Sequence, residues 1–153
     1  MIKISDEWET PQDLFDKLDK EFNFKVDACA NEGNAKCDLY LKDASKRWDS
    51  IPNVNSSMFC NPPYSRGKTG PILKRAWEAS EYTTVVCLVL TRVLSCKYFD
   101  FLDHHNGENH TRYWVTGLEV RHLSRRVKFT NPHRESSSPN FECCLLIMNK
   151  SEQ

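Results

Sequence analysis

Apolar and polar positions repeat with two different spacings along the chain of 153 residues, one typical of helices and one of strands. The first segment with helical spacing carries Leu14, Phe15, Leu18 and Phe22. It predicts an amphipathic helix that has Thr10 as its N-cap, Pro11 in its first turn and an end near residue 22. By the same criteria we expect further helices at residues 71–80 and 96–105, and strands at residues 24–28, 57–60, 85–90, 113–118, 127–129 and 141–148.

The run from Val85 to Leu90 is apolar at every position. A strand of this kind is buried on both faces, which is typical of a parallel sheet. From residue 57 onward the predicted strands alternate with helices, so the sequence favours an α/β fold with helices flanking the sheet. The length suits one domain, and we expect residues 1–153 to form it without a separate target-recognition domain. Residues 35–56 are polar and predict no clear element.

Several classes of protein fit the composition poorly. No apolar run approaches the ~18 residues of a membrane span, and the first residues lack the apolar core of a signal peptide. Seven cysteines without C-x-x-C spacing disfavour a disulfide framework and a zinc cluster. The histidines at 104, 105 and 110 match no usual zinc spacing, so we expect no metal. These features predict a cytoplasmic protein.

The formal net charge is zero, but the charges are unevenly distributed. Acidic side chains outnumber basic ones 12 to 8 in residues 1–49, and the excess is reversed in the remainder. The densest basic run, residues 121–128, contains no acid and includes Arg125, Arg126 and Lys128. A face that binds nucleic acid needs a local cluster of this kind, although a solvated charged strand or loop would have the same composition.

The segment Asn61-Pro62-Pro63-Tyr64 follows a short apolar strand and carries the candidate chemistry. Each proline fixes its own φ and restrains the residue before it, so the segment forms a stiff corner. The Asn61 side-chain oxygen and the Pro62 carbonyl can accept hydrogen bonds from an exocyclic amino group of a base. The Tyr64 ring can stack on that base. The alternative is a proline-rich turn with a core tyrosine.

Three polar segments follow predicted strands: Asp27, the corner at residues 61–64, and Thr91-Arg92. The carboxyl ends of parallel strands lie at one edge of a sheet, and ligands bind beyond that edge in open α/β folds. We therefore expect these segments to converge at one site.

The motifs extend this interpretation over most of the chain. They are Thr10-Pro11-x-x-Leu14-Phe15, Val26-Asp27-Ala28-Cys29-Ala30, Asn34-Ala35-Lys36-Cys37, Phe59-Cys60-Asn61-Pro62-Pro63-Tyr64-Ser65 and the ending Val127-Lys128-Phe129 before a Ser/Pro loop and a final strand. Over roughly residues 8–148 the sequence resembles the small phage and prophage DNA N6-adenine methyltransferases, the phage Dam family. The resemblance implies a Rossmann-like sheet, S-adenosylmethionine as cofactor and DNA as substrate.

The resemblance also implies roles for individual residues. Trp8, Thr10 and Pro11 correspond to a segment that packs on the methionine end of the cofactor. Asp27, with the adjacent Ala28, corresponds to the acid that contacts the methyl donor. Asp43 is a candidate for a second acid on the adenosyl group, or else a solvated loop carboxylate. Asn61, Pro62 and Tyr64 correspond to the residues that hold the target base, and Pro63 stiffens the corner. Ser65, Arg66 and Lys68 lie where phosphates beside a flipped base would pass.

One departure from larger methyltransferases concerns the cofactor half. No Gly-x-Gly-like turn follows Asp27, and Cys60 lies only 33 positions further along. This distance is too short for two crossover units, so we expect an abbreviated Rossmann-like sheet.

The sequence therefore predicts methylation of the adenine N6 amino group in DNA, after base flipping. Two alternatives remain open at this point. One is another amino acceptor, such as cytosine N4 or a protein glutamine amide. The other is a catalytically silent protein that binds cofactor or DNA. The recognition sequence and the oligomeric state do not follow from these residues.

Overall fold

A computed structural model describes residues 8–44, 48, 57–65, 67–96, 116–130 and 140–150. The helices are α1 (Gln12–Phe22), α2 (Thr69–Ala79) and the 3-10 helix η2 (Thr91–Ser95). The strands are β1 (Phe24–Asp27), β2 (Leu39–Tyr40), β3 (Ser57–Cys60), β4 (Val85–Leu90), β5 (Leu118–His122), β6 (Val127–Lys128), β7 (Asn140–Phe141) and β8 (Cys143–Met148).

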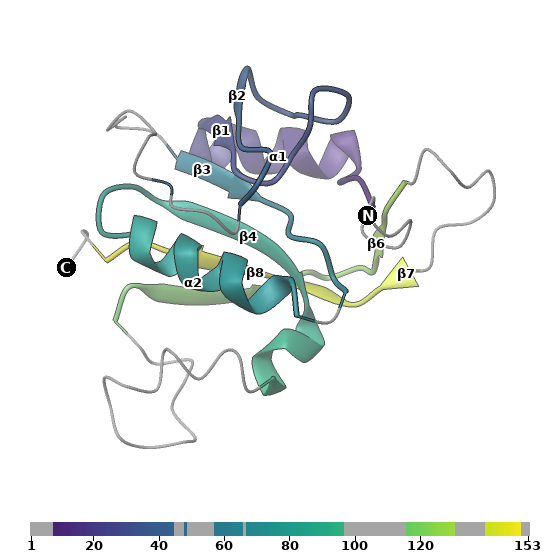
Figure 1. Ribbon diagram of the computed structural model, residues 1–153. Coiled ribbons are helices and arrows are strands. Elements are labelled where there is room, and N and C mark those ends of the chain that lie inside the picture. The colour runs from purple at the N-terminus through teal and green to yellow at the C-terminus, as the bar shows by residue number, and fades with distance from the viewer. Residues whose placement is uncertain are drawn as a thin grey trace.

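Six strands form one mixed sheet in the order β2-β1-β3-β4-β8-β5 (Figure 1). The first four are parallel, as the apolar β4 predicts, whereas β8 pairs antiparallel with both β4 and β5. It follows that β5 runs in the same direction as β4. Strands β6 and β7 form a separate antiparallel pair. The expected α/β sheet with flanking helices is confirmed.

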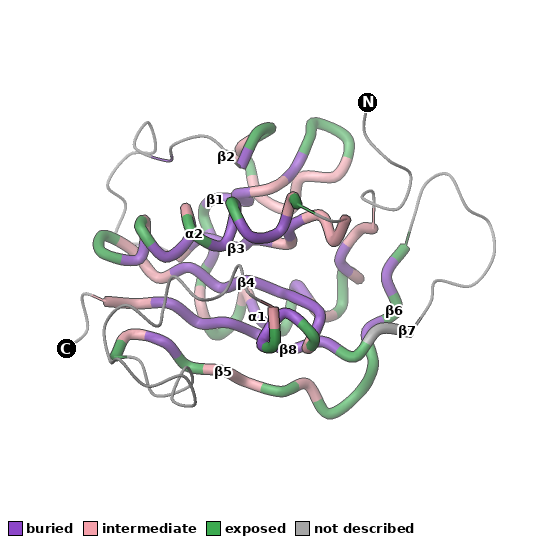
Figure 2. The backbone as a smooth tube through the Cα atoms, turned by 60° about the horizontal axis from the view of Figure 1, so that its bottom comes forward, coloured by how far each residue is buried: buried purple, intermediate pink, exposed green. Residues whose placement is uncertain are grey.

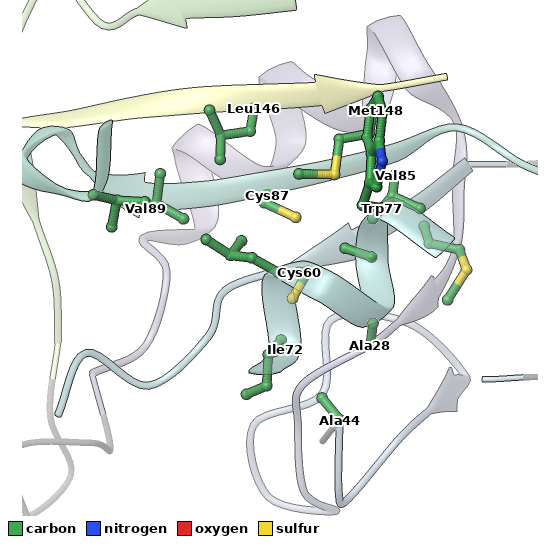
Figure 3. Packing of buried hydrophobic residues seen from close by; sticks show 14 of the residues in the cluster. Ala28, Ala44, Cys60, Ile72, Trp77, Val85, Cys87, Val89, Leu146 and Met148 are labelled. Atoms are coloured by element: carbon green, nitrogen blue, oxygen red, sulfur yellow. The ribbon is translucent and has the colours of Figure 1, made fainter. Parts of the chain in front are cut away.

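One helix covers each face of the sheet. Figure 1 shows α2 in front of the sheet and α1 behind it. Side chains alternate along β4: Val85, Cys87 and Val89 belong to the core on the α2 face, and Val86, Leu88 and Leu90 to the core on the α1 face. Figure 3 shows Ile72 and Trp77 of α2 on the same side of the sheet as Cys87. Two apolar layers therefore hold the sheet rigid, and β4 and β8 are buried throughout (Figure 2).

The structure corrects the expected start of the first helix. Pro11, not Thr10, occupies the N-cap position, and no side-chain hydrogen bond caps the helix. Thr10 is buried instead. The second helix begins at Thr69, two residues before the expected Pro71.

The strand expected at residues 113–118 is also wrong at its C-terminal end. Thr116 and Gly117 form a turn, and β5 begins only at Leu118. Gly117 has a φ of +90°, a conformation that favours glycine. Its carbonyl accepts a hydrogen bond of 2.7 Å from the Asn149 amide, which closes the turn against the chain after β8. Residues 113–115 lie outside the described part of the chain.

The part of the sheet that is expected to bind the cofactor has few elements among the described residues. Within the described residues between Asp27 and Ser57, the only regular element is β2, with two residues. Of the helix expected at residues 96–105, only Cys96 is described, and it follows η2 in extended geometry. The histidines at 104, 105 and 110 also lie outside the described residues.

The seven cysteines are free thiols. Those in the apolar runs, Cys87, Cys143 and Cys144, are buried among aliphatic side chains. In the described part of the chain, no helix combines the length and the apolar character needed to cross a membrane.

Candidate active site

The carboxyl ends of β1 and β3 lie side by side at the point where the sheet order reverses. The chain leaves β1 toward β2 on one side, whereas it leaves β3 through α2 toward β4 on the other. In open α/β sheets this divergence creates the crevice in which ligands bind. A cavity of about 480 Å³ lies here, and its lining includes Asp27, the last residue of β1, and Asn61, which follows β3. The expected convergence of these two residues is therefore observed.

Asp27 organises the loop that follows β1. Its Oδ2 accepts a hydrogen bond of 3.0 Å from the Lys36 amide, and its Oδ1 accepts one of 3.3 Å from the Cys29 amide. Only 3% of Asp27 is exposed, so this acid is buried although it lies at the end of a strand. Burial raises the pKa of Asp27 from 3.8 to about 6, although the Lys36 and Cys29 amides and the Lys36 ammonium act in the opposite direction.

The loop after Asp27 is shaped by two asparagines instead of a Gly-x-Gly turn. The Asn31 side-chain oxygen accepts hydrogen bonds from the amides of Gly33, at 2.8 Å, and Asn34, at 3.1 Å. The Asn34 side-chain oxygen accepts one of 2.7 Å from the Asn31 amide. Both asparagines line the cavity. Hydrogen bonds from main-chain amides to the side chains of Asn31 and Asn34 therefore shape this wall of the cavity.

Asn61 is held by hydrogen bonds at both ends of its carboxamide. Its Nδ2 donates to the Trp8 carbonyl oxygen at 3.1 Å, and its Oδ1 accepts from the Tyr64 hydroxyl at 2.7 Å. A carbonyl oxygen can only accept a hydrogen bond, so the contact with Trp8 fixes which atom of the carboxamide is the nitrogen.

Tyr64 faces the interior of the protein. Its hydroxyl lies 3.2 Å from the Leu88 carbonyl oxygen as well, and its ring meets the Phe129 ring edge-on, with 5.7 Å between centroids. Burial raises the pKa of the Tyr64 hydroxyl well above its ordinary value. The ring does not belong to the cavity lining. Stacking of Tyr64 on a base therefore stays a prediction, and it requires the ring to turn outward.

The other predicted cofactor and corner residues divide into two groups. Trp8, Thr10, Asp43 and Pro63 line the cavity. Pro11, Ala28 and Pro62 are not among the lining residues: Pro11 precedes α1, and Ala28 and Pro62 are buried. The Pro63 carbonyl accepts a hydrogen bond of 2.7 Å from the Thr69 hydroxyl, which ties the corner to the start of α2.

The predicted DNA-binding residues lie at the same edge of the sheet where the structure describes them. Lys68 lines the cavity, Ser65 is half-buried beside the corner, and Arg66 lies outside the described residues. Because β5 runs in the direction of β4, its carboxyl end leads the chain to the edge that holds the site. Arg125, Arg126 and Lys128 follow there and are exposed. Thr91 and Arg92 begin η2 and do not line the cavity.

Sequence reasoning missed part of this site. Glu9, Lys36 and Lys42 also line the cavity. Only Lys36 lies in a motif that the sequence singled out. Glu9 pairs through its main chain with Thr130, far away in the sequence, and no local pattern indicates such a contact.

A comparison with curated proteins found no match. A family model described as DNA N-6-adenine-methyltransferase (Dam) matches residues 2–153, almost the whole chain. This match confirms the family resemblance carried by the motifs from Thr10 to Phe129. With Asn61 and Asp27 at one cavity and the family model spanning the sequence, the chain belongs to the DNA N-6-adenine-methyltransferase (Dam) family.

Proposed function

We propose that this protein transfers a methyl group from S-adenosylmethionine to the N6 amino group of adenine in DNA. The observation that carries the proposal is the shared cavity, which both Asn61 and the buried Asp27 line. Membership of the family supports DNA adenine as the substrate.

Asn61 supplies the stabilisation of the transition state in this proposal. The lone pair of an adenine amino group is delocalised into the ring, so attack on a methyl group places positive charge on that nitrogen. The Asn61 Oδ1 and the Pro62 carbonyl accept hydrogen bonds from the amino group, and these bonds strengthen as the charge grows. No strong base is needed beforehand, because the amino group loses its proton after attack.

The cavity suits the cofactor in size and charge. Its volume of about 480 Å³ falls in the range of roughly 300–1,000 Å³ that is usual for small-molecule sites. S-adenosylmethionine supplies an electrophilic methyl group on a positive sulfonium. Asp27 and Asp43 contribute carboxylates that complement its positive charges, and Trp8 and Thr10 form part of the wall. Pro11 and Ala28 follow the lining residues Thr10 and Asp27 in the sequence.

DNA is held by cations around the cavity. Lys68 lies at the cavity itself, and Arg125, Arg126 and Lys128 are exposed at the same edge of the sheet. Together with Ser65 and Arg66, they bind phosphates on either side of a base that has left the duplex. The Tyr64 ring turns outward and stacks on that base.

The remaining parts of the proposal concern the whole chain. The sheet is an abbreviated Rossmann-like sheet, in which β2 alone stands on the cofactor side of β1 among the described residues. The chain works as one methyltransferase domain in the cytoplasm.

Transfer of a labelled methyl group tests the proposal. The purified protein is incubated with methyl-labelled S-adenosylmethionine and DNA, and the DNA is digested to nucleosides. We expect the label on N6-methyl-2′-deoxyadenosine. Label on cytosine N4, label on a protein glutamine, or cofactor binding without any transfer would overturn the proposal in favour of one of the alternatives.

A further inference from the structure

The orientation of the Asn61 carboxamide depends on the main chain at residue 8. Its Nδ2 donates to the Trp8 carbonyl oxygen, 53 positions earlier in the sequence. This contact turns Oδ1, the proposed acceptor for the adenine amino group, away from residue 8. A carboxamide flipped by 180° would present its own NH2 to the amino group, and two donors repel each other.

The direction of the Trp8 carbonyl is itself fixed by Thr130. The Glu9 amide donates to the Thr130 carbonyl oxygen at 2.7 Å, and the Thr130 amide donates to the Glu9 carbonyl oxygen at 3.1 Å. The Trp8 carbonyl and the Glu9 amide belong to one planar trans peptide group, in which C=O and N–H point in opposite directions. One side of this peptide therefore binds Thr130 while the other side binds Asn61.

The segment that carries Thr130 is well anchored. Phe129 is 1% exposed and packs against the Tyr64 ring, and Val127 is buried in the same core. Thr130 itself is exposed, so its main chain, rather than its side chain, makes the connection. The anchor at Phe129 reaches Asn61 through the hydrogen bond from the Glu9 amide to Thr130, the rigid Trp8–Glu9 peptide and the hydrogen bond from Asn61 Nδ2 to the Trp8 carbonyl.

We infer that Thr130 is a positioning residue for Asn61: its main-chain pairing with Glu9 aligns the Trp8–Glu9 peptide, which holds the Asn61 nitrogen toward Trp8 and leaves the Asn61 oxygen as the acceptor for the target base. The effect on catalysis rests on the proposed function. The orientation of the Asn61 side chain does not rest on the proposed function, and it can be measured separately.

Substitutions at Thr130 distinguish the main chain from the side chain. Thr130→Pro removes the amide that donates to Glu9. Thr130→Ala removes the exposed side chain and keeps both main-chain hydrogen bonds. With saturating DNA and cofactor, we expect Thr130→Pro to lower kcat roughly tenfold while the KM for DNA changes by less than about twofold. Thr130→Ala keeps the kcat of the wild type. A wild-type kcat in Thr130→Pro, or an equal loss in Thr130→Ala, overturns the inference.

An NMR measurement gives a readout that does not require activity. The side-chain amide of Asn61 is identified in 15N-labelled protein as the signal that is missing in Asn61→Ala. We expect its protons to exchange with water about tenfold faster in Thr130→Pro than in the wild type or Thr130→Ala. Equal exchange in all three proteins overturns the inference. If the wild type transfers no methyl group at all, the proposed function fails and this measurement still decides the positioning.

Asn61→Asp provides a second test if Thr130→Pro does not fold. A carboxylate cannot donate to the Trp8 carbonyl, whereas a protonated carboxyl can. We expect the kcat of Asn61→Asp, divided by that of the wild type at the same pH, to rise by about tenfold or more between about pH 8 and about pH 5.5. The ratio removes the pH dependence that Asp27 gives to both proteins. A ratio that stays flat overturns the inference.

Discussion

The Tyr64 hydroxyl donates a 2.7 Å hydrogen bond to the side-chain oxygen of Asn61, so the two residues expected to receive a base are bound to each other. The same hydroxyl lies 3.2 Å from the Leu88 carbonyl oxygen. For Tyr64 to stack on a base, its ring has to leave both acceptors, and this movement also frees the Asn61 oxygen. The inward position of Tyr64 therefore opposes binding of the base in the proposed function.

Tyr64→Phe is expected to make this movement easier. The substitution keeps the ring for stacking and removes a hydrogen bond that contributes about 0.5–1.5 kcal/mol to the stability of the folded protein. The free energy of unfolding falls by about this amount. The population that can accept a base rises, so the KM for DNA falls by up to about fivefold. Steady-state kinetics and urea unfolding measure the two effects.

Two further variants control for this result. Tyr82→Phe removes the hydroxyl of a tyrosine that is 72% exposed, and it should change neither quantity. Tyr64→Ala removes the ring as well and should raise the KM for DNA. If Tyr64→Phe raises the KM for DNA as much as Tyr64→Ala does, the hydroxyl supports base binding. The claim that the inward hydrogen bond of Tyr64 opposes base binding is then wrong.

Most of the sheet could be predicted from the sequence because its central strands are buried on both faces. The apolar run Val85–Leu90 predicts a strand buried on both faces, and β4 occupies the same residues. The edge strands are different. β2 has two residues, one of them exposed, and β5 carries alternating charged side chains that resemble a basic loop. Its Arg121 pairs with Glu21 of α1 at 2.8 Å, a contact that no local pattern indicates.

Asp27 makes the stability of the protein depend on pH. Its folded-state pKa of about 6 lies above the ordinary value of 3.8, so the folded protein holds this proton more tightly than the unfolded chain. The contribution to stability is present in full below about pH 3.8 and is lost as the pH rises to about 6. The difference between a pKa of 3.8 and one of about 6 corresponds to a loss of about 3 kcal/mol in the free energy of unfolding.

Urea unfolding of the wild type and of Asp27→Asn between pH 4 and about pH 7 measures this effect. The free energy of unfolding of the wild type should fall relative to that of the variant as the pH rises, because the carboxamide of the variant has no proton to lose. The affinity for the positively charged cofactor should change in the opposite direction and rise with pH in the wild type alone. Parallel stability curves for the two proteins would rule out a raised pKa for Asp27.

Arg125 and Arg126 are expected to contact DNA phosphates. Changing both to alanine should weaken binding to all sequences alike, because phosphate contacts position the protein and carry no sequence information. The slope of log K against log salt should become smaller by about two units. Binding titrations at several salt concentrations measure this slope, and the sequence preference should survive.

The matched control removes two positive charges from another surface. Lys17 and Lys20 are exposed on α1, and changing both to alanine should leave the salt slope unaltered. An unchanged slope in the arginine double variant would move the phosphate contacts elsewhere, toward Lys68 and its neighbours.

Strand patterns alone could predict only the part of the candidate site that lies at strand ends. Asp27 and Asn61 meet because β1 and β3 are parallel neighbours, which strand patterns indicate. The contact between Trp8 and Asn61 and the pairing of Glu9 with Thr130 are different, since they use main-chain atoms that every residue has. The side chains at these positions therefore carry no signal for them. The inward position of Tyr64 depends on Phe129, which packs against it from 65 positions further along.

The rate of formation of N6-methyladenine in the wild type and in Asn61→Ala tests the central claim most directly. Asn149→Ala is the control, since it removes the same carboxamide after β8, at the opposite edge of the sheet. With saturating cofactor and DNA, we expect Asn61→Ala to lower kcat by about 10²–10³-fold, the effect of losing one hydrogen-bond partner of the transition state. Cofactor affinity and the rate of the Asn149→Ala control should stay close to those of the wild type. Formation of N6-methyladenine by Asn61→Ala at a near wild-type rate would contradict the account.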